Sequence, residues 1–445
     1  MRNKFDSIKE IRLSQIKPSQ RQLNHLELGY YNFIHFGLNT FTKKEWGSGN
    51  VPLDKFKIKH INTDDWCKKL KATGSRGIII TAKHHDGFCL FPSKFTDYTI
   101  AGTDYQNGKG DIIQQLSDSC KKYHLKLGIY LSPWDRHEKT YGTDAYNDFF
   151  CNQLEELCTN YGEIFCFWFD GACGEGKNGK AQVYDWQRYF SVIRRLQPNA
   201  VIANCGEDVR WIGNEHGIAR PAEWSVVPKR LQCYDKVMAQ SQQEAGALNM
   251  LTKINNSDKN LGAIGTISPD EEICYWPSEM NIPITYFGWF YRPVFEILFT
   301  RSVKNLVKCY CNSVGNNSTL LINVPPNKEG KLPEKFIKRL MKARRKIENI
   351  FGNCVARQTY QQSERYTLAL ENEERISSAV IKEDIEQGQR IAEFSLLADG
   401  KKIYSGETVG YKKFCFFKPV KCKNIELIIN RSRCEPMIKS VALYR

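Results

Sequence analysis

The chain has 445 residues, of which 41% are hydrophobic and 12% aromatic, a composition that excludes a disordered chain and allows a large core with more than one domain. Its formal net charge of +15 would suit a polyanion. However, the basic residues are dispersed, and those of 328–346 alternate with apolar residues at helical spacing, so we expect a solvated helix face and no nucleic-acid partner.

The cysteines and the amino terminus limit the class of protein further. Sixteen cysteines lack the regular spacing of a small disulfide scaffold or of a zinc site, so we expect reduced thiols and no structural metal. No run of 18 apolar residues predicts a membrane span, and the first residues have no apolar signal core. We therefore expect a cytoplasmic protein without a membrane partner, although a secreted protein whose signal was removed would have the same sequence.

Strands and helices alternate along the first half of the chain. The residues up to about 24 are polar, and a helix is predicted from Thr63, a good N-cap, to just before Gly74. The other predicted helices are 110–123, 144–160 and 184–196, and the predicted strands are 30–36, 77–81, 127–131, 164–169 and 200–204. This alternation predicts a (β/α)8-like TIM barrel, an α/β fold.

The second half of the chain breaks this rhythm. We predict long loops over the barrel mouth for 205–290, then a helix over 293–312, a strand over 319–324 and a helix over 333–350. After Gly352, short alternating runs predict an antiparallel β-sandwich. The expected domains are therefore a catalytic barrel of residues 1–352 and a C-terminal β-sandwich of residues 353–445.

The chemistry-bearing residues follow the predicted strands. Asp170 ends the apolar run Ile164–Phe169 and precedes a glycine-rich loop, which is where barrel enzymes carry catalytic groups. Three of the eight histidines also fall at such positions, so we expect a polar pocket. The polar residues at predicted strand ends are His35, Glu45, His84, His85, Asp86, Trp134, Asp135, Asp170 and Glu215.

Two kinds of chemistry fit this pocket. Histidine and aspartate could bind a catalytic metal, but the first strand has no His-x-His pair. Alternatively, two carboxylates could hydrolyse a glycosidic bond, with histidines binding hydroxyl groups and aromatic rings packing on sugar faces. The mixture of aromatic residues with His, Asp and Glu favours the second hypothesis, which needs no metal or cofactor.

Several motifs resemble those of a known family. His-Phe-Gly at 35–37, Glu45-Trp46, Lys-His-His-Asp-Gly-Phe at 83–88, Tyr-Leu-Ser-Pro-Trp-Asp at 130–135 and Trp-Phe-Asp-Gly at 168–171 occur in this order. Their order is similar to that of the retaining α-L-fucosidases of glycoside hydrolase family 29, over about 30–352. The resemblance implies a barrel with a C-terminal β-sandwich and a fucosylated oligosaccharide or glycoconjugate as substrate. It leaves the oligomeric state open.

The resemblance also implies roles for individual residues. Asp170 matches the nucleophile. The implied fucose-binding positions are His35, Glu45, Trp46, His84 and His85, with Tyr130 and Trp134 as further candidates. Glu215, in a segment similar to that of the α-1,3/1,4-specific branch, matches the acid/base.

Glu279 competes for the acid/base role, because it lies in the sequence near Trp289-Phe290-Tyr291, which also resembles a family segment. Glu279 and Trp289 are therefore candidate substrate-binding residues. This chain has Thr285-Tyr286-Phe287 where the family carries Arg-Pro. Two other classes remain as hypotheses, a metal-dependent barrel hydrolase and a catalytically inactive fucose-binding protein.

Overall fold

The computed structural model describes residues 4–232, 234, 261–268, 270–360 and 365–445. Eight parallel strands form one sheet in the order β5-β4-β3-β2-β1-β10-β9-β6. Their bounds are β1 Tyr30–Ile34, β2 Gly77–Lys83, β3 Lys126–Leu131, β4 Ile164–Phe169, β5 Val201–Asn204, β6 Arg210–Trp211, β9 Ser278–Pro283 and β10 Ser318–Asn323. A bridge between Ala203 and Val209 joins the two edges. The predicted barrel is confirmed.

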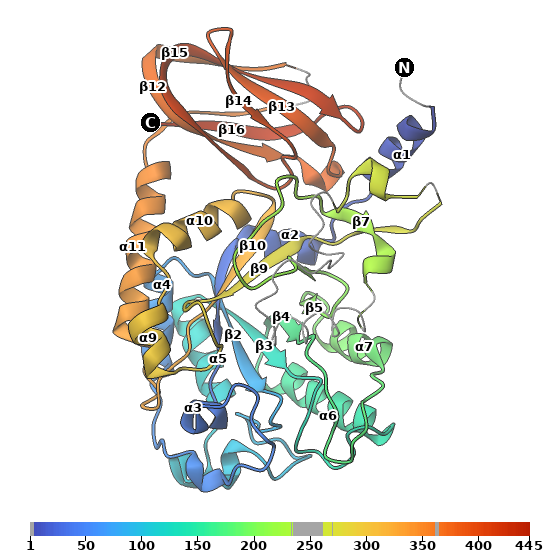
Figure 1. Ribbon diagram of the computed structural model, residues 1–445, viewed down its shortest axis with the longest axis vertical. Helices are drawn as coiled ribbons and strands as arrows, with labels where there is room; N and C mark the ends of the chain where they lie inside the picture. Colours follow the sequence, from blue (N-terminus) through green and yellow to red (C-terminus); the bar gives the residue numbers. More distant parts are fainter. Residues whose placement is uncertain (1–3, 233, 235–260, 269, 361–364) are drawn as a thin grey trace.

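Helices surround this sheet on the outside (Figure 1). Asn62, rather than the predicted Thr63, caps the first barrel helix, because the Asn62 side chain accepts a hydrogen bond from the amide of Asp65. Within the described ranges, the helices after β1 are α3 Leu38–Thr42, α4 Thr63–Ala72, α5 Ile112–Tyr123, α6 Ala145–Asn160, α7 Trp186–Leu196, α9 Pro293–Phe299, α10 Val303–Ser313 and α11 Glu334–Phe351. The helix predicted over 293–312 is thus two helices, and Ser302 caps the second.

The prediction of loops throughout 205–290 is wrong, because this segment contains the barrel strands β6 and β9 and the ribbon of β7 Val226–Pro228 with β8 Ile273–Tyr275. Strand β6 has two residues, too few for a recognisable pattern. Strand β9 carries the buried polar residues Ser278, Glu279 and Asn281, and the first two form side-chain hydrogen bonds inside the protein. An apolar pattern therefore could not reveal either strand.

The chain after α11 forms the predicted antiparallel β region. Hydrogen bonds connect its six strands into one sheet in the order β11-β16-β12-β15-β13-β14. The bounds are β11 Cys354–Thr359, β12 Arg365–Glu383, β13 Ile391–Ala398, β14 Lys401–Gly406, β15 Lys413–Ser432 and β16 Ile438–Tyr444. This sheet has a hydrophobic core of its own.

The C-terminal sheet lies at the end of the barrel where the strands begin (Figure 1). The amide of Asn317, just before β10, donates to the carbonyl of Lys412 over 3.0 Å, and the amide of Phe414 donates to Gly315 over 2.8 Å. The helices α1 Lys4–Ser14 and α2 Gln20–Leu28 precede β1 on the same side. The carboxyl ends of the strands therefore face away from the C-terminal sheet.

Two simpler expectations concern membranes and cysteines. Among the described residues, no helix is both long and apolar enough to span a bilayer. The cysteines in the described part of the chain are free thiols, most of them buried, as predicted.

Candidate active site

The carboxyl ends of five barrel strands bring polar side chains together. His35 follows β1, His84 and His85 follow β2, and Asp170 follows β4, while Tyr130 lies near the end of β3 and Asn323 ends β10. His84 and His85 are adjacent, with ring centroids 4.1 Å apart, and the His35 ring lies 5.7 Å from that of His84. The predicted polar cluster at the barrel mouth is therefore present.

The carboxylate of Asp170 is held at both oxygens. The Tyr130 hydroxyl donates to Oδ2 over 2.9 Å, and the amide of Ala172 donates to Oδ1 over 2.7 Å. The side chain remains 21% exposed, so a ligand can reach it. These contacts fix the direction of the carboxylate, as a nucleophile at this position requires.

The tautomer of His85 follows from its neighbours. Ser132 donates its single hydroxyl hydrogen to the carbonyl of Trp134 over 2.7 Å. The 2.6 Å contact between Ser132 Oγ and His85 Nδ1 therefore places the hydrogen on Nδ1. Nε2, which lies 3.8 Å from Asp170 Oδ2, carries the lone pair of the neutral ring. This nitrogen can accept a hydrogen bond from a ligand hydroxyl.

The same reasoning applies to His35. Asn323 donates its Nδ2 hydrogen to the carbonyl of Trp289 over 2.7 Å, which orients the amide so that Oδ1 is the atom facing His35. Because Oδ1 only accepts, the 2.9 Å contact places a hydrogen on His35 Nδ1. Nε2 of His35 is then a second hydrogen-bond acceptor.

Burial keeps these imidazoles neutral. It lowers the pKa of His85 to about 4 and that of His35 to about 3, and it lowers the pKa of His84 well below its ordinary range. The buried Nδ1 of His84 has no hydrogen-bond partner in the described part of the chain. A buried nitrogen without a partner is costly unless a ligand or water satisfies it.

Aromatic rings and one carboxylate form the wall of the site. Glu45 Oε1 accepts hydrogen bonds from the amides of Trp289 and Phe290, and Arg292 lies 3.5 Å from Oε2. Burial raises the pKa of Glu45. Glu45 thus fixes the segment that brings the Trp289 ring to 5.1 Å from the His35 ring.

Trp46 and Trp134 form another part of the wall. Their ring centroids are 5.4 Å apart, and the Trp134 ring lies 5.1 Å from that of His85. The structure therefore brings together the predicted residues His35, Glu45, Trp46, His84, His85, Tyr130, Trp134, Asp170 and Trp289.

Three of these side chains also have the geometry of a possible metal site. One ligand atom from each of His84, His85 and Asp170 lies within 4.8 Å of the others. Imidazole nitrogen with a carboxylate oxygen is a donor set that suits zinc or a similar divalent ion. The metal hypothesis thus keeps a physical basis in the described residues.

The two candidate acid/base residues occupy different parts of the barrel. Glu215 lies in the loop after β6, partly exposed, and its carbonyl accepts a hydrogen bond from Arg301 over 3.1 Å. Arg301 in turn donates to the carbonyl of Pro283, the last residue of β9, over 2.7 Å. This loop is therefore at the same end of the barrel as Asp170.

Glu279 is not brought to this end. It is the second residue of β9, 1% exposed, and it accepts hydrogen bonds from Trp168 Nε1 over 2.9 Å and from the Tyr31 hydroxyl. His25, from α2, lies 3.7 Å away. These partners occupy the closed interior below Trp168, so Glu279 is part of the barrel core and not of the group around Asp170.

The sequence did not single out Ser132, Asn323 or Phe290 as site residues. Asn323 ends a buried strand, as Asp170 does, so the rule that found Asp170 also applies to it. Ser132 lies in the loop that carries Trp134, but its part in orienting His85 depends on a contact 47 residues away along the chain. Only the fold reveals that contact.

Comparison with known proteins identifies relatives of the whole chain. The profile of the family described as alpha-L-fucosidase matches residues 14–345. The chain is 34% identical over 469 aligned residues to alpha-L-fucosidase 1 of Arabidopsis thaliana, a match that covers 96% of this chain and 87% of the relative.

Solved structures are similar over the same length. A putative alpha-L-fucosidase from Bacteroides ovatus superimposes with a TM-score of 0.87 at 35% identity, covering 100% of this chain and 76% of that protein. A fucosidase of glycoside hydrolase family 29 from Ruminococcus gnavus, solved in complex with fucose, has a TM-score of 0.80 at 27% identity and covers 97% of this chain and 95% of that protein. The similarity includes both the barrel and the C-terminal sheet.

Proposed function

This chain belongs to the alpha-L-fucosidase family of glycoside hydrolases, and from that premise we propose that it is a retaining exo-α-L-fucosidase acting on branched, Lewis-type α-1,3- or α-1,4-fucosides. The observation that carries the mechanistic part is Asp170, an accessible carboxylate held by Tyr130 and Ala172 beside three neutral histidines. The substrate of this site is a fucosylated glycan.

The proposed reaction has two displacements. Asp170 attacks the anomeric carbon of fucose while Glu215 protonates the departing glycosidic oxygen, and a covalent fucosyl–enzyme ester forms. Glu215, now a carboxylate, then removes a proton from a water molecule that attacks the same carbon and releases fucose. Two inversions give net retention of configuration.

Neutral histidines suit recognition of a neutral sugar. His35 Nε2 and His85 Nε2 are acceptors, so each needs a hydroxyl that donates. A fluorine in place of such a hydroxyl can only accept, and it would face a lone pair. The proposal therefore requires hydroxyl donors on the face of fucose that meets these rings.

The nucleophile and the acid make different demands on substrate chemistry. Asp170→Asn should lose nearly all turnover, retain fucose binding and regain activity with azide, which supplies a small external nucleophile.

Glu215→Gln should slow the hydrolysis of natural glycosides far more than that of activated aryl fucosides, because only the natural glycosides need protonation of the leaving group. Glu279→Gln is the matched control, since its carboxylate belongs to the barrel interior. Near-normal activity of Asp170→Asn would contradict the role of Asp170 as nucleophile. Leaving-group dependence in Glu279→Gln would contradict the assignment of Glu215 as the general acid.

The linkage preference is a finer proposal, supported by the likeness of the 211–217 segment to that of the α-1,3/1,4-specific branch. In a branched Lewis glycan, galactose lies beside fucose on one N-acetylglucosamine, so the loops beyond the pocket can contact it. Contacts that strengthen in the transition state raise turnover as well as affinity. We expect a higher kcat/KM for a Lewis trisaccharide than for 2′-fucosyllactose or an aryl fucoside, and the reverse order would contradict this preference.

A metal-dependent hydrolase is the second candidate, favoured by the cluster of His84, His85 and Asp170. A two-carboxylate reaction needs no Lewis acid, so we expect full turnover after treatment with a chelator and exhaustive dialysis. Activity that a chelator abolishes and that zinc or manganese restores would make the metal mechanism the better one.

A further inference from the structure

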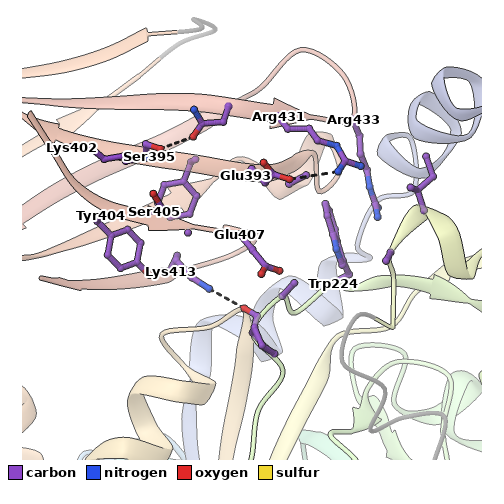
Figure 2. Close-up of a pocket in the computed structure, with 18 residues that line it drawn as sticks. Trp224, Glu393, Ser395, Lys402, Tyr404, Ser405, Glu407, Lys413, Arg431 and Arg433 are labelled. Carbon is purple, nitrogen blue, oxygen red and sulfur yellow. Dashed lines mark hydrogen bonds and ion pairs between the residues drawn. The ribbon is translucent and has the colours of Figure 1, made fainter. Parts of the chain in front are cut away.

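A second cavity lies between the barrel and the C-terminal sheet, and Figure 2 shows the residues around it. Its volume is about 1010 Å³. Strands β13, β14 and β15 supply one wall, and the barrel segments 221–224 and 263–264 supply the other. Small-molecule sites have volumes of roughly 300–1,000 Å³, so this cavity has room for several sugar units.

This cavity is remote from the catalytic pocket. Arg210, which begins β6, donates to the carbonyl of Trp224 over 3.1 Å, so Trp224 lies near the amino end of the barrel. Asp170 follows the carboxyl end of β4. The two sites thus lie at opposite ends of the strands, and a ligand in the cavity is not in contact with the catalytic carboxylate.

Trp224 provides a rigid aromatic surface in the cavity wall. The Arg433 guanidinium packs 3.5 Å from the Trp224 ring centroid, and Figure 2 shows the two side chains against each other. Arg433 also donates to the carbonyl of Gly262 over 2.5 Å. Trp224 is 5% exposed, so only a small part of the indole meets the cavity, and that part can pack against an apolar edge of a sugar.

The lining carries more positive than negative charge. Four cations, Lys402, Lys413, Arg431 and Arg433, face two carboxylates, Glu393 and Glu407. Arg431 pairs with Glu393 at 3.6 Å and with Glu10 at 3.3 Å.

Two of the remaining cations, Arg433 and Lys402, have no ion pair in the described part of the chain, whereas Lys413 donates to Asn316 Oδ1 over 2.7 Å. Arg433 is 5% exposed, and in the described part of the chain its Nη1 has no hydrogen-bond partner. The side chain of Lys402, which is exposed at the rim, has neither a hydrogen bond nor an ion pair there. Positive charge without a carboxylate partner favours an anionic ligand.

We propose that this cavity binds an oligosaccharide carrying a carboxylate, with the acidic group near Lys402 and a sugar ring against Trp224. Tyr404 and Ser405 on β14 add hydroxyl groups that can hydrogen-bond to the sugar. The carboxylate can come from a sialic acid or from a uronic acid. An acidic glycan bound in this cavity would keep the enzyme attached to its substrate, while the active site at the opposite end of the barrel releases fucose.

Calorimetric titration of the full chain tests this proposal. The probes are 3′-sialyllactose, digalacturonic acid and lactose, with the catalytic pocket saturated by L-fucose. We expect at least one acidic probe to bind 10-fold or more tightly than lactose and to bind more weakly at high salt. The acid that binds identifies the source of the carboxylate. Equal binding of lactose, or no binding of either acid, would overturn the proposal.

Two adjacent lysines on β14 provide a matched pair of variants. Lys402 lines the cavity, whereas Lys401 is also exposed but does not. Lys402→Glu should weaken binding of the acidic probe at least 5-fold, and Lys401→Glu should leave it unchanged. Both variants should retain turnover of an aryl fucoside, because neither residue touches the catalytic pocket. Equal effects of the two substitutions on binding would place the ligand elsewhere and overturn the assignment.

Discussion

Single contacts at Asp170 connect the geometry of the site to its rate. The hydrogen bond from Tyr130 to Oδ2 orients the carboxylate. A hydrogen bond to a charged group is worth about 1.5–3 kcal/mol, so Tyr130→Phe should lower kcat roughly 10- to 100-fold. KM should change less, because the other side chains that we propose bind fucose are unchanged.

A split between kcat and KM separates this positioning role from loss of structure. In Tyr130→Phe, kcat on an aryl fucoside should fall, while KM and the circular dichroism of the folded protein should stay close to those of the parent enzyme. Equal loss in both kinetic constants, or a changed spectrum, would mean that Tyr130 acts in another way.

The buried histidines make stability depend on pH. The pKa of His85 falls from 6.5 to about 4 on folding, so between these values the unfolded chain binds more protons than the folded one. The free energy of unfolding should therefore decrease as pH falls from about 6.5 to 4, by about 3 kcal/mol for this one residue.

The measurement is urea unfolding at pH 7 and pH 5. His85→Gln should flatten this pH dependence, whereas the control His60→Gln, at an exposed position, should not alter it. An unchanged slope in His85→Gln would show that His85 is charged in the folded protein.

Among the connecting elements, the loop that carries Glu45 and Trp46 depends on one glycine. Gly47 has φ +63°, and a Cβ there would lie 2.5 Å from Asn39 Oδ1 and 2.7 Å from Asp86 Cβ. Gly47→Ala should displace the loop, raise KM for a fucoside and cost about 1–3 kcal/mol of stability. Steady-state kinetics and thermal unfolding measure both effects.

Gly179→Ala is the matched control for backbone strain. Gly179 has a similar φ of +71°, but a Cβ there would meet no atom within 4 Å. This variant should lose only about 1 kcal/mol of stability, because of backbone strain, and its KM should be unchanged. If both variants raise KM equally, steric contact with Asn39 and Asp86 is not what positions the loop.

At the scale of elements, the sequence predicted what depends on local pattern. Strand β4 was recognisable because six apolar residues follow one another and end at a carboxylate. Strand β9 was not recognisable, because it carries Glu279 into the barrel interior. The partners that accommodate this carboxylate there lie on α2, β1 and β4, far away in the sequence. The same limit applies to the site, since the histidines stood out as residue types, while the tautomers of His35 and His85 depend on distant partners.

At the scale of the whole molecule, the contact between the barrel and the C-terminal sheet decides whether the two parts unfold together. Phe414 on β15 is 8% exposed and packs 4.3 Å from the ring of Phe351 on α11, whereas Phe416 is 44% exposed. Phe414→Ala should cost about 3–5 kcal/mol, and Phe416→Ala should cost much less.

Tryptophan fluorescence reports the unfolding of the barrel selectively, because all nine tryptophans precede residue 353. In Phe414→Ala, the fluorescence transition should move to lower denaturant together with the far-ultraviolet circular dichroism transition. A fluorescence transition that stays in place would mean that the barrel unfolds independently of the C-terminal sheet.

The C-terminal sheet covers the end of the barrel opposite to the pocket, and both α1 and the last strand β16 lie on that side (Figure 1). An anchor attached at either end of the described chain would therefore leave the barrel mouth pointing away from its support. Molecules immobilised in this way on a bead should turn over large glycoproteins nearly as fast as free ones. Random coupling through surface lysines would leave some molecules with the barrel mouth facing the bead, and these molecules would not act on large glycoproteins.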